Sequence, residues 1–283
     1  MKKRYKFALG AGAVLILGVG AGLANGLHID EGVVFQPRPH IPREALTLRG
    51  EDQFDAVRHE RVELGGQTLA ISTFGPDAGP LLVNCFGNAA DRRSSGEQYA
   101  GKLAPHGQAL LWDYPGYGDS AGKPSVGAIE AAAPELVALI EARAGDRPLI
   151  YWGHSLGGFV CSTLAAQSEQ ADALVLETTA ASIRSVAKAW TPEGVPLRVS
   201  FDQSLLRFDT PAVLDGFTAP VLVIGAGRDR VLPVELAREL AETLEADGLD
   251  VRYLELPEAN HFAAGFAPRA QAAVAEVIAE VGE

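Results

Sequence analysis

The chain has 283 residues, of which 47% are apolar, and its formal net charge is −12. This length and apolar content predict a folded domain with a large core and exclude intrinsic disorder. No patch of Lys and Arg interleaved with aromatic residues occurs, so the sequence indicates no nucleic-acid partner.

The N-terminus differs from the rest of the chain. Cations at positions 2, 3, 4 and 6 precede an uncharged, mostly apolar stretch from Phe7 to Leu27. A basic start followed by an apolar run is typical of a signal peptide or a membrane anchor, and the basic end stays in the cytoplasm. We therefore expect residues 1–27 to form a helix outside the domain. As an anchor it would hold the domain outside the cytoplasm, on the periplasmic side in a Gram-negative bacterium. Cleavage near Ala24, which would release a secreted or periplasmic protein, is the alternative.

Residues 28–54 contain several prolines and few apolar residues, so we expect them to form a linker to a domain at 55–283. The domain opens with an expected antiparallel pair of strands at 60–64 and 68–74, which join at Gly65-Gly66.

Apolar runs of strand length then alternate with segments of helical character. Continuously apolar strands separated by helices indicate an α/β fold with a mostly parallel central sheet and helices on both faces. Pro134 predicts a kink or a split in the helix that contains it. Strands are expected at 80–85, 108–112, 148–152, 173–176, 220–224 and 251–256, and helices at about 94–105, 126–144, 156–168, 233–246 and 267–281.

One stretch, residues 178–217, interrupts this alternation. It lies between two expected strands and contains Trp190, Phe201, Phe208 and Phe217. An aromatic insertion after the carboxyl end of a strand is typical of a short cap or lid over a pocket. A plain helical excursion packed on the sheet edge fits the same pattern, and the sequence leaves both interpretations open.

The motif with the clearest chemistry is Gly-His-Ser-Leu-Gly at residues 153–157. It follows an expected strand and precedes an expected helix. On such a turn the hydroxyl of Ser155 projects above the sheet, and the flanking glycines permit the tight backbone. The start of the helix offers free N–H groups to a developing negative charge. We interpret Ser155 as a nucleophile; a glycine-rich turn without chemistry is the alternative.

A serine hydroxyl needs a base, and His261 is the candidate. It follows the last expected strand, at 251–256, in the position that this strand–turn–helix arrangement assigns to the base. The other histidines precede the sheet, end a helix, or, as His154 does, neighbour the serine with a side chain that should diverge from it.

Asp229 is the candidate acid that would orient the base. It follows the strand at 220–224 and a glycine-containing turn, so it should lie at the same edge of the sheet. It could instead cap that turn. Glu177, Asp202 and Asp209 are rival acids.

A developing oxyanion needs two donors. The backbone N–H of Leu156, directly after the serine, is one candidate. The turn after the strand at 80–85 is expected to supply the second. We choose Asn88, because Gly87 allows the backbone to approach closely.

The two cysteines, Cys85 and Cys161, fall at the end of a strand and on the inner side of a helix, and we expect both to be small core residues. A disulfide between them suits an oxidising compartment, but the sequence leaves the pairing open. No cysteine and histidine spacing typical of a metal site occurs, and no dinucleotide fingerprint follows a strand. We therefore expect neither a metal nor a cofactor.

Over residues 55–282 the chain resembles the α/β-hydrolase superfamily. Residues 113–125, Asp-Tyr-Pro-Gly-Tyr-Gly-Asp-Ser-Ala-Gly-Lys-Pro-Ser, are similar to the Tyr-Arg-Gly-Tyr-Gly-x-Ser-x-Gly-x-Pro-Ser segment of its lid-poor branch. That branch lies near the depalmitoylase-like and monoacylglycerol-lipase-like serine hydrolases. Residues 87–89 match its His-Gly-Asn-Ala turn, and the segments around Asp229 and His261 fall where its acid and base lie.

The resemblance implies an α/β-hydrolase fold with a triad of Ser155, Asp229 and His261, and an oxyanion hole at Asn88 and Leu156. Phe86 departs from the pattern, because the branch usually has a histidine there that braces the turn. This departure leaves the bracing of the Asn88 turn unaccounted for.

Together these residues predict a cofactor-independent serine hydrolase. It would cleave a carboxylic ester, or an acyl thioester, of a small lipid-like substrate through an acyl-enzyme on Ser155. The expected partners are this substrate and a membrane that residues 7–27 contact, whereas the oligomeric state is left open. An aminopeptidase or amidase with the same triad, and a non-catalytic binding domain, are the alternatives.

Overall fold

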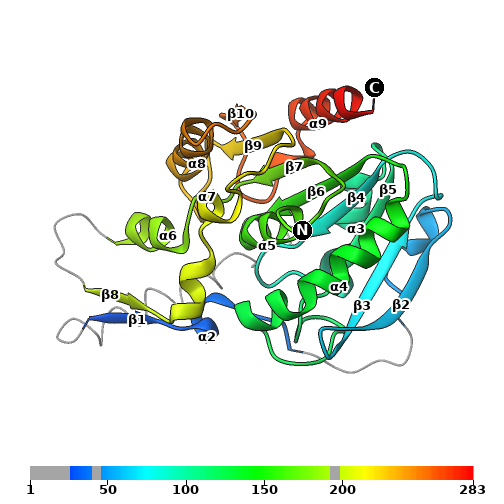
Figure 1. Ribbon diagram of the computed structural model, residues 1–283, viewed down its shortest axis with the longest axis horizontal. Coiled ribbons are helices and arrows are strands. Elements are labelled where there is room, and N and C mark those ends of the chain that lie inside the picture. The colour runs from blue at the N-terminus through cyan, green and yellow to red at the C-terminus, as the bar shows by residue number, and fades with distance from the viewer. Residues whose placement is uncertain (1–25, 40–45, 192–197, 283) are drawn as a thin grey trace, which may run out of the picture.

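The computed structural model describes residues 26–39, 46–191 and 198–282 (Figure 1). Within them, one eight-stranded sheet has the order β10-β9-β7-β6-β4-β5-β3-β2. The pairs from β10 to β5 are parallel, whereas β3 pairs with β5 and β2 in the antiparallel sense. The strands are β2 (Arg58–Leu64), β3 (Gln67–Phe74), β4 (Leu81–Cys85), β5 (Gln108–Trp112), β6 (Leu149–His154), β7 (Ala171–Glu177), β9 (Val221–Ala226) and β10 (Val251–Leu256).

The expected antiparallel pair at the start of the domain is confirmed as β2 and β3. Leu64 pairs with Gln67, so Gly65 and Gly66 form a two-residue turn. Both glycines have positive φ angles, of 58° and 72°. Such a turn requires this backbone at both central positions, which explains the Gly-Gly pair.

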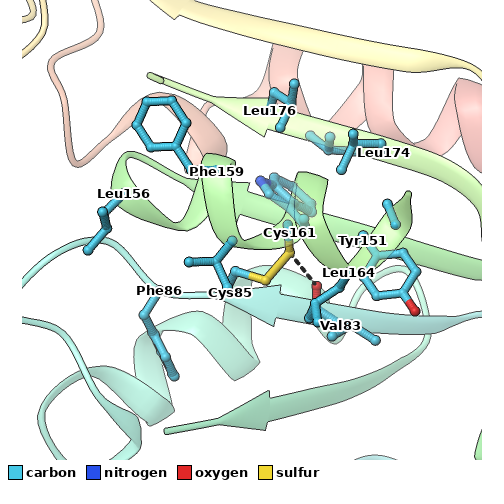
Figure 2. Packing of buried hydrophobic residues seen from close by; sticks show 14 of the residues in the cluster. Val83, Cys85, Phe86, Tyr151, Leu156, Phe159, Cys161, Leu164, Leu174 and Leu176 are labelled. Atoms are coloured by element: carbon cyan, nitrogen blue, oxygen red, sulfur yellow. Dashed lines mark hydrogen bonds between the residues drawn. A yellow bond between two sulfur atoms is a disulfide. The ribbon is translucent and has the colours of Figure 1, made fainter. Parts of the chain in front are cut away.

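Helices cover both faces of the sheet. Trp152 of β6 faces α3: its indole donates to Glu177, and the Lys102 ammonium of α3 lies over its ring. The preceding residue of β6, Tyr151, lies beside Leu164 of α5 (Figure 2). Because neighbouring residues of a strand point to opposite faces, α3 and α5 lie on opposite sides. The long helices are α3 (Arg92–Leu103), α4 (Val126–Ala144), α5 (Leu156–Ala165), α8 (Val234–Ala246) and α9 (Pro268–Val281).

The expected split at Pro134 does not occur, because α4 is one helix from Val126 to Ala144. Pro134 is the ninth residue of this helix and is exposed, while Ala133 and Leu136 beside it are buried. Packing of this apolar face against the sheet maintains the helix through the proline.

The segment expected to be a linker folds onto the domain instead. It contains β1 (Leu27–Ile29), α2 (Glu31–Val34) and the short 3-10 helix η1 (Glu51–Gln53). Ile29, Phe35 and Leu48 are buried parts of the hydrophobic core. A boundary at residue 55 is therefore wrong for the described parts of this segment.

The described residues of the insertion after β7 form a strand as well as short helices. Its elements are α6 (Ile183–Trp190), β8 (Val199–Phe201), the 3-10 helix η2 (Gln203–Arg207) and α7 (Thr210–Val213). β8 pairs in parallel with β1, so the two form a ribbon that extends from the main sheet (Figure 1).

A disulfide joins Cys85 and Cys161, with 5.7 Å between their Cα atoms. It links the end of β4 to the middle of α5, inside the buried apolar cluster (Figure 2). The pairing that the sequence left open is therefore present in the structure.

The apolar helix expected at residues 1–27 lies outside the described residues, apart from Gly26 and Leu27; neither is helical, and Leu27 begins β1. No helix within the described part of the chain is both long and apolar enough to span a bilayer.

Candidate active site

The carboxyl ends of the parallel strands gather the candidate side chains at one edge of the sheet. Ser155 directly follows β6, the turn that contains Asn88 follows β4, and Glu177 ends β7. Asp229 follows β9 and His261 follows β10, and a short 3-10 helix, η3 (Ala264–Phe266), comes after His261. Ligands of open α/β sheets bind at this edge.

Ser155 occupies a strained turn between β6 and α5. Its φ of 55° and ψ of −121° lie where residues other than glycine are rare. The turn is held by its own backbone: the Ser155 N–H donates to the Glu177 carbonyl at 2.9 Å, and the Ser155 carbonyl accepts from Gly158 N–H at 2.9 Å. The Ser155 hydroxyl makes no hydrogen bond with a described residue, and the side chain is partly exposed. It is therefore free to meet a ligand.

The glycines of the motif allow this turn to pack tightly. A Cβ on Gly153 would lie 2.3 Å from the Gly157 carbonyl oxygen, and one on Gly157 would lie 2.0 Å from the Cys85 carbonyl oxygen. Both distances are far below van der Waals contact. The glycines thus let α5 begin directly against β4, which brings the start of α5 beside the turn after β4.

His261 and Asp229 form a buried, hydrogen-bonded pair. Nδ1 of His261 donates to Oδ2 of Asp229 at 2.7 Å, and their side chains are 4% and 1% exposed. The other carboxylate oxygen of Asp229 accepts from the backbone N–H groups of Val231 and Leu232. Asp229 therefore caps its turn and orients the imidazole at the same time. Because Nδ1 carries the proton toward Asp229, Nε2 of the neutral ring is left with a lone pair.

The rival acids are occupied elsewhere. Glu177 is buried and accepts hydrogen bonds from Lys102 Nζ at 2.8 Å, Trp152 Nε1 at 2.9 Å and Gly265 N–H at 2.8 Å. Burial alone would raise the pKa of Glu177, but Lys102 and the other donors lower it to about 2. Asp202 contacts His28 and the backbone of Glu31, and Asp209 caps α7.

His154 makes contacts that its position in the sequence did not indicate. Its Nε2 donates to the His261 carbonyl oxygen at 2.9 Å, so its Nδ1 is left to accept from the Tyr99 hydroxyl at 2.9 Å. Its ring centroid is 4.9 Å from that of His261. Burial is the main cause that lowers the pKa of His154 to about 4, so the ring is neutral near pH 7. The neutral His154 ring therefore hydrogen-bonds to the backbone of His261.

Among the described residues, the structure records no backbone or side-chain acceptor for the N–H groups of Leu156 and Asn88, which both lie at this edge. Leu156 is the first residue of α5, where N–H groups lack an intrahelical acceptor. The Asn88 side chain, by contrast, is hydrogen-bonded at both of its polar ends. Its Oδ1 accepts from Gln36 N–H and Tyr117 O–H, and its Nδ2 donates to the Val34 carbonyl. The backbone N–H of Asn88 is thus open to a ligand.

Phe86, which stands where the resemblance leads one to expect histidine, is buried. Its ring packs edge-on against Tyr99 with 5.0 Å between the centroids, and its carbonyl accepts from the Tyr114 hydroxyl at 2.7 Å. The turn passes close to His154, because a Cβ on Gly87 would lie 2.6 Å from His154 Nδ1. Phe86 therefore supplies packing and no polar side-chain brace.

Apolar surface lies beside the pair of His261 and Asp229. Phe262 is 60% exposed, and its ring meets the His261 ring at 5.0 Å. A cavity of about 640 Å³ lies elsewhere, at α3, and Arg49, Arg93 and Phe266 are among the residues that line it. No group of three or more His, Cys, Asp and Glu residues that could hold a metal ion occurs in the described ranges.

Comparison with known proteins identifies the family. A family model described as the alpha/beta hydrolase fold matches residues 80–193. A Mycobacterium tuberculosis protein described as uncharacterized is 33% identical over 236 residues, which cover 81% of this chain and 79% of that protein. The chain belongs to the α/β-hydrolase superfamily. The resemblance to this superfamily that the sequence indicates over most of the chain is therefore confirmed, and the protein is called the hydrolase from here on.

Other relatives of the hydrolase are named lysophosphatidylserine lipase ABHD12. The protein of Danio rerio is 30% identical over 197 residues and that of Rattus norvegicus is 32% identical over 179 residues. The matches cover 62% and 57% of this chain, and 51% and 44% of those proteins. This chain therefore spans about half the length of these relatives.

Among solved structures, the esterase Pf2001 of Pyrococcus furiosus has a TM-score of 0.64 at 16% identity, and the match covers 88% of this chain and 100% of the esterase. Est1E of Butyrivibrio proteoclasticus, with ferulic acid bound, has a TM-score of 0.58 at 17% identity over 78% of this chain and 96% of its own. At these identities the likeness shows a shared fold.

Proposed function

We propose that this chain is a serine hydrolase that cleaves carboxylic esters through an acyl-enzyme on Ser155. The observation that carries the proposal is the buried hydrogen bond of 2.7 Å between His261 and Asp229, at the edge where Ser155 stands on its strained turn. An imidazole fixed by a carboxylate at Nδ1 and free at Nε2 is the base that a serine nucleophile requires.

In the acylation step, Ser155 Oγ attacks the ester carbonyl carbon while its proton passes to His261 Nε2. Asp229 stabilises the imidazolium that forms. The carbonyl oxygen gains the negative charge and accepts hydrogen bonds from the N–H groups of Leu156 and Asn88. The tetrahedral intermediate then expels the alcohol, which takes the proton from His261, and the acyl group stays on Ser155 as an ester.

In the deacylation step, water attacks the acyl carbon and gives a proton to His261 Nε2. A second tetrahedral intermediate forms at the same two N–H groups. Its collapse breaks the bond to Ser155 Oγ, which recovers the proton from His261, and the carboxylic acid leaves. These steps use groups of this chain and one water molecule.

The proposed substrate class is a monoacyl lipid ester. Exposed Phe262 offers an apolar surface beside His261 for an acyl chain, which supports a lipid-like substrate. The relatives named lysophosphatidylserine lipase support the same class. Thioesters share the acyl chemistry, so the first assay compares acyl ester, acyl thioester and amino-acid amide substrates of matched size.

The decisive experiment is labelling by a fluorophosphonate probe together with hydrolysis of a p-nitrophenyl ester. Ser155→Ala should abolish labelling and lower kcat by at least about 10³-fold, because no hydroxyl is left to be acylated. Asp229→Asn should lower kcat by about 10⁴-fold with little change in KM, because the amide stabilises the wrong tautomer of His261.

Ser162→Ala is the matched control on the same helix. The Ser162 hydroxyl is buried and donates to the Gly158 carbonyl, so its removal should preserve labelling. Unchanged turnover in Ser155→Ala, or labelling that depends on Ser162, would refute the assignment. A folded wild-type protein that neither labels nor hydrolyses any of the three substrate classes would favour the non-catalytic alternative.

We further propose that the chain before residue 26 anchors the hydrolase domain outside the cytoplasm, a shorter segment than the sequence indicated because Leu27 belongs to β1. The cationic start before an apolar stretch supports this topology, and the disulfide between Cys85 and Cys161 supports an oxidising compartment. The full chain should remain with the membrane after a wash at high salt and be accessible to protease from the non-cytoplasmic side. Recovery in a soluble fraction as a chain that begins near residue 25 would instead indicate cleavage.

A further inference from the structure

The described residues before β2 include a segment that crosses the candidate oxyanion turn. We define residues 26–38 as the strap and residues 86–89 as the oxyanion turn. We infer that the strap holds the Asn88 N–H in position as the second oxyanion donor, in place of the polar brace that Phe86 lacks. The inference rests on the proposed function and adds positioning residues to it.

The strap binds the Asn88 side chain at both of its polar ends. Gln36 N–H donates to Asn88 Oδ1 at 2.9 Å, and Asn88 Nδ2 donates to the Val34 carbonyl at 2.7 Å. Tyr117 O–H completes the set, because it donates to the same Oδ1 at 2.9 Å and accepts from Gln36 N–H at 3.0 Å. An amide held from both ends cannot rotate, so the backbone at Asn88 is fixed as well.

A second contact fixes the next residue of the turn. Ala89 has a φ of 58°, an unfavourable conformation for a residue with a Cβ. Its N–H donates to Asn88 Oδ1 at 2.9 Å, and its carbonyl accepts from Arg38 Nε at 2.6 Å. The strap therefore contacts two consecutive residues of the turn and stabilises a strained backbone there.

The other end of the strap is attached to the insertion after β7. β1 pairs with β8, and His28 contacts Ser200 and Asp202 at 3.0 and 3.1 Å. The strap residue Phe35 is buried, with its ring 6.0 Å from that of Phe208. These contacts make the strap a fixed support and not a loose tail.

The chemistry explains why such a support matters. A donor lowers the barrier only if it is already directed at the position of the oxyanion, and a turn that moves loses this alignment. The Leu156 N–H is fixed by the start of α5, but the oxyanion turn has no helix of its own at Asn88. Release of the strap should therefore impair the Asn88 donor and leave both the Ser155 turn and the hydrogen bond between His261 and Asp229 unchanged.

The test compares hydrolysis of p-nitrophenyl butyrate with that of its thionoester analogue in the full chain. A thionoester places its developing charge on sulfur, which is a weak hydrogen-bond acceptor, so it gains little from the oxyanion donors. The ratio of the two rates reports the quality of the oxyanion hole. Any unfolded fraction of a variant cancels in this ratio, because both substrates meet the same folded enzyme.

Gln36→Pro removes the backbone N–H that the strap donates to Asn88 Oδ1, without altering Asn88 itself. Phe35, with φ of −91° and ψ of 115°, already has a backbone that a following proline accepts. We expect Gln36→Pro to lower the ester-to-thionoester ratio at least threefold, and Asn88→Ala to lower it at least tenfold, mainly through kcat on the ester. Gln36→Ala retains the N–H and should retain the wild-type ratio, which makes it the matched control.

The possible results separate the inference from the proposed function. Ester hydrolysis that depends on Ser155, with the same ratio in wild type, Gln36→Pro and Asn88→Ala, overturns the inference alone. Equal decreases in the hydrolysis rates of the ester and the thionoester would show that the strap has a merely structural role, and would overturn the inference as well. Ester hydrolysis that persists in the Ser155→Ala variant would overturn the proposed function, and the inference with it.

Discussion

His154 and Glu177 form a buried polar group behind the candidate triad. His154 donates to the backbone of His261, and Glu177 receives the Lys102 ammonium, which also lies 4.4 Å from the Trp152 ring centroid. Both titratable groups have pKa values below their ordinary ranges, about 4 for His154 and about 2 for Glu177. A buried group that resists protonation links folding to pH.

His154 should make the folded state less stable as pH falls. Its pKa is near 6.5 when unfolded and about 4 when folded, so between these values the unfolded chain binds the extra proton. The contribution is fully present above pH 6.5 and is lost as pH falls toward 4, at up to about 1.4 kcal/mol per pH unit. Urea unfolding at a series of pH values should show a smaller slope for His154→Gln than for wild type in this window.

The comparison of His154→Gln with wild type contains its own control. Above pH 6.5 the histidine is neutral in both states, so the two proteins should change in parallel there. Below about pH 4.5, Glu177 adds a loss that both proteins share, because its folded pKa is depressed too. Equal slopes between pH 4 and 6.5 would contradict the buried, neutral state of His154.

At the scale of the elements, the junction of α5 with β4 determines where Ser155 and the oxyanion turn lie. Gly157, the second residue of α5, lies directly against the Cys85 carbonyl. The close contact is possible because glycine lacks a Cβ. A larger residue at this position would move the start of the helix, and with it the Leu156 N–H, away from the oxyanion turn.

Gly157→Ala should therefore reduce both stability and labelling. The added Cβ would lie 2.0 Å from the Cys85 carbonyl oxygen, and overpacking of this kind destabilises by about 1–3 kcal/mol. We expect fluorophosphonate labelling of the folded variant to slow at least tenfold. Gly127→Ala is the matched control, since Gly127 is the second residue of α4. A Cβ added there would lie 4.0 Å from its nearest neighbour, the Arg207 side chain.

The control should behave in the opposite direction. Alanine at the exposed position 127 should stabilise the protein by up to about 1 kcal/mol, because alanine favours a helix more than glycine does. Its labelling rate should equal that of wild type. A Gly157→Ala variant that unfolds at the wild-type urea concentration and labels at the wild-type rate would refute the tight junction.

The order of strands and helices could be predicted because buried parallel strands have continuous apolar sequences. β5 and β10 have the predicted bounds, and the other strands of the main sheet begin and end within two residues of the expected positions. β1 and β8 were not predicted. The candidate triad could be located for a related reason: Ser155, Asp229 and His261 each follow a strand closely, and the ends of parallel strands meet at one edge. A local sequence pattern was enough to locate these residues, because the topology of the sheet brings the ends of their strands together.

The support around the site could not be predicted in this way. Gln36 contacts Asn88 through its backbone N–H, which every residue but proline has, across 52 positions of sequence. Ile29 and Phe35 are buried, but the few apolar residues of this segment show no helical or strand periodicity that would indicate a core. The linker was therefore predicted wrongly, and the bracing of the oxyanion turn was left unexplained.

At the scale of the whole molecule, the disulfide joins two segments that each carry one proposed oxyanion donor. Cys85 directly precedes the oxyanion turn, and Cys161 lies on the helix that begins with Leu156. The two cysteines are 76 residues apart in sequence. A crosslink over such a distance restricts the unfolded chain strongly and so favours the folded state.

Loss of the disulfide should lower the free energy of unfolding by about 4.5 kcal/mol, the chain-entropy value for a loop of this length. The double variant Cys85→Ala/Cys161→Ala should unfold at a lower urea concentration than the oxidised wild type. Dithiothreitol should destabilise wild type and leave the double variant unchanged. Equal midpoints for wild type with and without the reductant, under conditions where thiol titration shows the bond is broken, would contradict this contribution.

The pairing of β1 with β8 has a consequence for how the chain is made. His28 and Ser200 are in contact although 172 positions separate them. During synthesis the N-terminal strand leaves the ribosome long before its neighbour exists, while contacts between distant positions form slowly. The β1 end of the strap must therefore wait, unpaired, until most of the central sheet has been translated. A nascent enzyme should acquire its core before it acquires a well-aligned oxyanion hole.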